Sequence, residues 1–183
     1  MTKKSWLSLV IGFSCLLTTM PSVAELVFTP CDGRVVSDLK FIINVDEKEL
    51  LFDKDIFFAP PTFYVGQYLD IQLRESLYVC DHHELVDLWV ALEIPLDGTR
   101  LRLFLVKSPH FPFFSFSLNP APFKSDLESS DEKFSFLLME VPPGMGGQYD
   151  FYAAYTKAGS NISELLFRLR SNLAAARVIL AND

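Results

Sequence analysis

Residues 68–74 have the sequence Tyr-Leu-Asp-Ile-Gln-Leu-Arg, in which apolar and polar side chains alternate. In an extended chain this period of two places Leu69, Ile71 and Leu73 on one face and the polar side chains on the other. Such a pattern is typical of a β-strand that packs one face on a hydrophobic core. Similar stretches recur along the chain, so we expect a fold built from strands.

The other predicted strands are runs rich in β-branched and aromatic residues between turn signals. They lie at residues 39–45, 49–52, 86–94, 101–105, 114–117, 134–141 and 148–156. Trp89 is expected to fill the centre of the core, and residues 125–133 are polar enough to predict a solvated loop. The spacing of these runs predicts an all-β sandwich or barrel.

The C-terminal stretch has two interpretations. Residues 162–180 contain leucines and an alanine run that favour an amphipathic helix. Residues 176–180 would serve equally well as a final strand. Local sequence leaves both open.

The N-terminus has the features of a secretory signal peptide over residues 1–24. Lys3 and Lys4 precede an apolar run from Trp6 to Leu17, which is too short to span a bilayer of about 30 Å. Residues 22–24 place small side chains at the cleavage site. We therefore expect an exported protein, in the periplasm, at the cell surface or outside the cell, with no transmembrane segment after the signal is removed.

The cysteine count suits an oxidising compartment. Cys15 leaves with the signal peptide, and Cys31 and Cys80 remain as a pair. We predict a disulfide between them. Closing a loop of about 50 residues would stabilise the fold by roughly 3–4 kcal/mol. Two buried free thiols are the alternative.

Composition excludes several classes of protein. Half of the 183 residues are hydrophobic, which rules out intrinsic disorder. The formal net charge is −7, and it becomes −9 when residues 1–24, with two lysines and no acid, are removed. With no cluster of Lys and Arg to override it, this charge argues against a nucleic-acid or anionic-membrane partner.

Two stretches together resemble a poorly characterised Ig-like β-sandwich module of bacterial secreted and surface proteins. Residues 86–98 match its DLYVA-type strand, and residues 147–155 followed by 171–174 match its GxYxFYA and SNLA motifs. Val65-Gly66-Gln67 matches its opening, so the resemblance covers about 115 residues, from Val65 to Leu180. Two departures from the pattern lie in turns: an extra Leu96, and Met145-Gly146-Gly147 where the module usually has one glycine.

The resemblance implies an Ig-like antiparallel two-sheet β-sandwich over residues 65–183, after a signal peptide (1–24) and N-terminal strands or an extension (25–64). It implies a strand from Asn172 onward and at most a short helix near 162–170. Every motif is structural, and the module supplies no catalytic residue to carry over.

One short segment groups metal-capable side chains. Residues 80–84 have the sequence Cys-Asp-His-His-Glu, and His82, His83 and Glu84, with a distant His110, are candidate ligands. Adjacent histidines of an extended chain point to opposite sides, and no spaced zinc motif is present. An exposed loop beside a disulfide is the preferred interpretation, so we expect no metal or other cofactor.

The best candidate for binding is the aromatic segment that contains Phe111, Phe113, Phe114 and Phe116, which has more phenylalanine than one strand face needs. Pro112 marks a bend or a sheet edge there. Exposed rings would dock a ligand or partner. The alternative is core packing with a covered edge, and we favour it because phenylalanine side chains are usually buried.

No motif for nucleophilic catalysis occurs, such as G-x-S-x-G, HExxH or a phosphate-binding loop. We therefore expect a secreted, non-enzymatic binding or structural module of the bacterial envelope, with a protein or glycan partner and an oligomeric state that the sequence leaves open. The alternative is a secreted hydrolase or metal-dependent enzyme whose site is assembled from separate loops.

Overall fold

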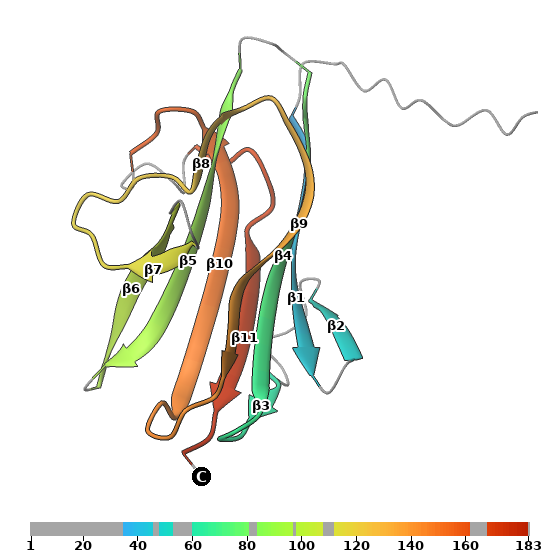
Figure 1. The fold of residues 1–183 in the computed structure, drawn as a ribbon. Helices are drawn as coiled ribbons and strands as arrows, with labels where there is room; N and C mark the ends of the chain where they lie inside the picture. Colours follow the sequence, from blue (N-terminus) through green and yellow to red (C-terminus); the bar gives the residue numbers. More distant parts are fainter. Residues whose placement is uncertain are drawn as a thin grey trace, which may run out of the picture.

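The computed structural model describes residues 35–45, 48–52, 60–80, 84–96, 98–107, 112–161 and 168–182, and it consists of two facing β-sheets (Figure 1). The strands are β1 (Val35–Val45), β2 (Lys48–Phe52), β3 (Thr62–Phe63), β4 (Tyr68–Val79), β5 (Val86–Leu96), β6 (Thr99–Val106), β7 (Phe113–Ser115), β8 (Lys124–Leu127), β9 (Ser129–Glu140), β10 (Gly147–Lys157) and β11 (Ala174–Leu180).

The smaller sheet has the order β2-β1-β4-β9, and the larger one has the order β3-β11-β10-β5-β6-β7 with β8 on β5. All pairs are antiparallel except β11 with β3. The orders β1-β4-β9 and β11-β10-β5-β6 are those of an Ig-like sandwich. The predicted all-β fold is confirmed, and residues 35–52 contribute two of its strands.

The described C-terminal residues form a strand. β11 spans Ala174–Leu180 and pairs with β10, and no helix occurs among the described residues. Residues 162–167, where the alternative helix was expected, lie outside them. Nor does the described part of the chain contain a helix that could cross a membrane.

The core lies between the two sheets. Leu69, Ile71 and Leu73 of β4 are at most 1% exposed, which confirms the inward face predicted from their alternation. Phe151 of β10 meets Phe41 of β1 with ring centroids 6.3 Å apart. Burying large rings from both sheets supplies much of the hydrophobic stabilisation.

Residues 125–133 are mostly exposed to solvent, as predicted, but the prediction that they form a loop was wrong. The segment forms β8 and the first part of β9, which cross from the larger sheet to the smaller one at Glu128. The Val79 amide donates to the Glu128 carbonyl at 2.9 Å and holds this crossing in place. The polar side chains are compatible with strands because most of them face solvent, and the half-buried Ser130 donates to the buried Glu75.

The Ser171-Asn172 pair joins the two sheets at one end. The Tyr155 amide donates to Ser171 Oγ at 2.9 Å. Asn172 Nδ2 donates to the Leu39 carbonyl at 3.0 Å, and its Oδ1 accepts from the Leu39 amide at 3.3 Å. The Asn172 side chain thus makes with Leu39 the pair of hydrogen bonds that a neighbouring strand would make.

Candidate binding surface

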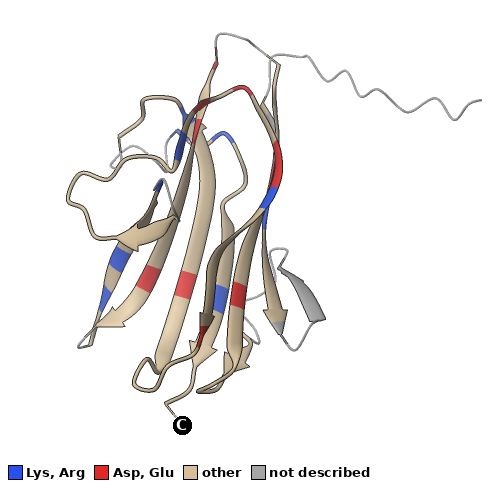
Figure 2. Cartoon of the chain, in the orientation of Figure 1, with Lys and Arg blue, Asp and Glu red and all other residues tan. Residues whose placement is uncertain are grey.

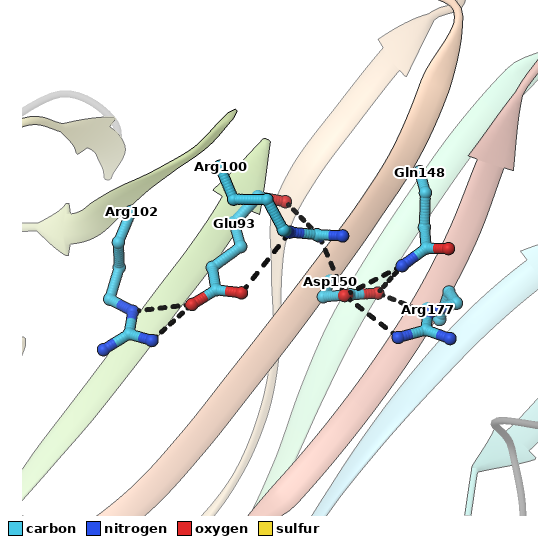
Figure 3. Close-up of polar contacts among 6 residues, drawn as sticks. All are labelled: Glu93, Arg100, Arg102, Gln148, Asp150 and Arg177. Atoms are coloured by element: carbon cyan, nitrogen blue, oxygen red, sulfur yellow. Dashed lines mark hydrogen bonds and ion pairs between the residues drawn. The ribbon is translucent and has the colours of Figure 1, made fainter. Parts of the chain in front are cut away.

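An ionic row crosses the outer face of the larger sheet (Figure 3). Arg177 of β11, Asp150 of β10, Glu93 of β5 and Arg102 of β6 are direct neighbours in the strand register. Two acidic side chains at adjacent cross-strand positions repel each other, so the row requires positive charge between them as well as at its ends.

Arg100 places its guanidinium between the two carboxylates. Its Nη2 lies 2.8 Å from Asp150 Oδ2, and its Nε lies 3.5 Å from Glu93 Oε2. Arg177 donates to Asp150 from Nε at 2.6 Å and from Nη2 at 3.1 Å. Arg102 donates to Glu93 from both Nε and Nη2. Both carboxylates are thus bound by arginines, and the row ties four strands together.

A row of aromatic and small side chains lies beside the ionic row. Trp89, Ala91 and Phe104 are buried there with Tyr152 packed against them. Trp89 Nε1 donates to Thr156 Oγ1 at 3.1 Å. The prediction that Trp89 fills the central core was therefore wrong. Its neighbours in β5 point inward, and the period of two puts the indole on the opposite face.

Exposed apolar side chains gather where the larger sheet ends at β7. We call Val106, Phe113, Phe116 and Leu118 the β7 edge patch; they are 38%, 52%, 56% and 90% exposed. Val106 and Phe113 face each other across β6 and β7. Apolar exposure of this extent, concentrated in one segment at an open sheet edge, is a feature of interaction sites.

The predicted aromatic segment divides between core and surface. Phe114 turns inward, with ring centroids 5.8 Å from Phe136 and 6.3 Å from Phe151. Phe113 and Phe116 are exposed, and Phe111 lies outside the described residues. Core packing and surface exposure, stated as alternatives from the sequence, thus apply to different rings of one segment.

The β7 edge patch lies in the most basic part of the chain. Residues 98–125 contain Arg100, Arg102, Lys107 and Lys124 and no Asp or Glu, which leaves a formal net charge of −11 on the rest. Lys107 is exposed and directly follows Val106. In Figure 2 the β6 ribbon bears only basic colour, whereas the next two strands, β5 and then β10, bear acidic residues.

A second buried carboxylate lies between the sheets. Glu75 of β4 is fully buried and accepts from Lys124 Nζ at 2.7 Å, Ser130 Oγ at 3.0 Å and Tyr155 OH at 2.8 Å. Its partners come from β8, β9 and β10. We call these four residues the inter-sheet cluster.

The environment of the inter-sheet cluster shifts two proton affinities. Burial, together with the charge of Glu75 and its hydrogen bond, raises the pKa of Tyr155 far above its usual range. Burial alone would lower the pKa of Lys124, but hydrogen bonds to Glu132 and Glu75 outweigh it and raise that pKa. Tyr155 therefore stays a neutral donor and Lys124 a cation, which matches a stable tie rather than a proton-transfer site.

The candidate metal ligands are only partly described. His82, His83 and His110 lie outside the described residues. Glu84 accepts from Arg170 Nε at 2.5 Å and lines a cavity of about 570 Å³ with Val35, Ser37 and residues 169–172. No group of three potential metal ligands occurs in the described part of the chain.

The predicted disulfide involves one described residue. Cys80 follows the last residue of β4, and Val79 pairs with Val35 at the start of β1. Cys31 lies outside the described residues, four positions before Val35 in the sequence. Four residues reach about 13 Å when extended, so the chain length permits the bond. The disulfide stays a prediction.

The sequence matches no protein family model and no curated protein.

Proposed function

We propose that this protein is an exported, non-enzymatic binding module of the bacterial envelope that contacts a partner through the β7 edge patch. The observation that supports this most directly is the exposure of Phe113, Phe116 and Leu118 beside a strand that has no second neighbour within the described residues. Open edges are normally shortened, charged or covered, because they pair with other chains.

The rest of the polar chemistry of the described chain supports a binding role over catalysis. Among the described residues three carboxylates are buried. Glu75 and Asp150 accept hydrogen bonds from side chains of neighbouring strands, and Asp87 accepts from the backbone amides of Asp126 and Gly159. A general acid or base must instead reach a substrate proton. The β7 edge patch, in contrast, combines exposed apolar side chains with a strand that has no second neighbour within the described residues.

The test is site-specific photo-crosslinking in intact cells of the source bacterium. A photoreactive amino acid in place of Phe116 should yield a discrete crosslinked species. The matched control replaces Leu138, which is 61% exposed on the other sheet. Equal crosslinking from both positions, or none from position 116, would contradict the proposal.

Export and the disulfide are tested on the same material. Removal of residues 1–24 gives a mature chain that begins at Glu25, and intact mass spectrometry locates that end. Reduction should add two hydrogens if Cys31 and Cys80 are bonded. A chain that retains its first residues in the envelope fraction would refute export through a cleaved leader.

A further inference from the structure

Resting on the binding role proposed above, we infer that the occupant of the β7 edge patch is an extended, acidic protein segment that adds to β7 as a further strand. The inference joins three properties of the same edge: unpaired backbone, apolar side chains and local positive charge.

The unpaired backbone of β7 is complementary to a chain in the extended conformation. β6 pairs with one side of β7, and the described residues provide no neighbour on its other side. The amide and carbonyl groups of a peptide match such an edge, as in other cases of strand addition. Lipid headgroups and soluble sugars offer no such repeating pattern of donors and acceptors.

The side chains of the edge define what the added strand must place next to them. Phe113 and Ser115 point to the outer face of the sheet because Phe114, between them, packs into the core. Side chains alternate along an added strand in the same way. An apolar side chain is therefore favoured beside Phe113, within reach of Val106.

The charge of the edge favours an acidic strand. The strand next to β7 is β6, which carries Arg100 and Arg102, both paired with carboxylates, and no acid. The exposed Lys107 directly follows Val106, the register partner of Phe113, and adds a positive charge at this edge. At physiological salt, charges beyond about 8 Å are largely screened, so this local balance outweighs the acidic remainder of the molecule. An anionic membrane would also face that acidic remainder, which disfavours a lipid surface.

Fluorescence anisotropy on the mature protein tests the inference with synthetic peptides of about ten residues. The probe alternates Glu and Val, and its charge control alternates Lys and Val. A third peptide has the probe sequence with alternate amides N-methylated, in two versions that each block one side of the strand. We expect the probe to bind at least about tenfold more tightly than the Lys peptide, and one N-methylated version to lose binding.

Three variants locate the binding. Phe113→Ser should weaken the probe by about tenfold, and Lys107→Glu should reduce or reverse the preference for Glu over Lys. Leu138→Ser, on the other sheet, should leave affinity unchanged. Circular dichroism confirms that each variant is folded, which is expected because all three side chains are exposed.

Several outcomes would overturn the inference: no binding of the probe at millimolar concentration, equal binding of the Lys peptide, insensitivity to both N-methylated versions, or preferential binding to phosphatidylglycerol vesicles. Self-association that Phe113→Ser abolishes would instead assign the edge to a second copy. The proposed function survives each of these if position 116 still crosslinks in cells, so the two failures are distinguishable.

Discussion

Two of the buried carboxylates, Glu75 and Asp150, differ in which strands they hold together. Glu75 lies between the sheets and binds groups from β8, β9 and β10, whereas Asp150 lies on the outer face and binds arginines of β6 and β11 in its own sheet. The side chains of the arginines are 23% to 38% exposed, whereas Lys124 is 19% exposed. The same kind of ion pair should therefore matter more between the sheets than along one of them.

The largest expected effect comes from removing the cation of each site. Lys124→Met leaves Glu75 with no cation in a fully buried position, and it should lower the free energy of unfolding by about 3–5 kcal/mol. Arg177→Met leaves Asp150 with Arg100, and about 1 kcal/mol is expected. Urea unfolding of both variants measures the difference.

Replacing the whole inter-sheet ion pair sharpens the first test. A variant with Glu75→Met, Lys124→Met and Tyr155→Phe removes the charge together with two of its three partners and leaves only Ser130, so most of the loss should be recovered. Equal losses for Lys124→Met and Arg177→Met would refute the distinction between the two carboxylates.

An intermediate effect is expected from alkaline pH. The pKa of Tyr155 is raised in the folded protein, so its contribution to stability is complete below about pH 10, where the unfolded tyrosine ionises, and is lost as pH rises further. The raised pKa of Lys124 acts in the same direction. For Tyr155, whose pKa is raised strongly, the free energy of unfolding should fall by about 1.4 kcal/mol per pH unit above that point.

Tyr155→Phe isolates the tyrosine contribution. The variant loses the hydrogen bond to Glu75 at neutral pH but should show a shallower decline between about pH 10 and pH 11. Denaturant midpoints across this range measure the slope. An unchanged slope would show that Tyr155 does not titrate with unfolding.

The smallest expected effect lies at the exposed end of the ionic row. Arg102 is 58% exposed, so Arg102→Gln should change stability by less than about 0.5 kcal/mol. Thermal unfolding compared with the wild type gives the value. A loss as large as that of Lys124→Met would mean that the outer row, rather than the inter-sheet cluster, dominates the electrostatic stability.

Local pattern was a sound guide where burial follows the period of the strand. The alternation of residues 68–74 predicted the inward face of that strand correctly, because one face of the strand meets apolar neighbours. The same period could not show which face of β5 is the core, since nearly all of its residues are apolar. Trp89 was therefore assigned to the wrong side.

The candidate site was predictable only as a segment. Sequence identified the phenylalanine-rich stretch that includes Phe113 and Phe116, but not which rings are exposed, because Phe114 has its partners on β9 and β10. The polar residues 125–133 were misassigned for a related reason. The group that satisfies Ser130 is Glu75, 55 positions away in the chain.

The amino-acid sequence alone determined that the chain forms strands, because alternation and β-branched or aromatic content act over a few neighbouring residues. It also determined that residues 98–125 carry basic residues and no Asp or Glu, because the order of residues alone fixes this distribution. The tertiary structure decided which carboxylates are buried with partners and which phenylalanines remain at an open edge. Those outcomes depend on contacts between residues far apart in the chain, and their energies exist only once the two sheets have packed.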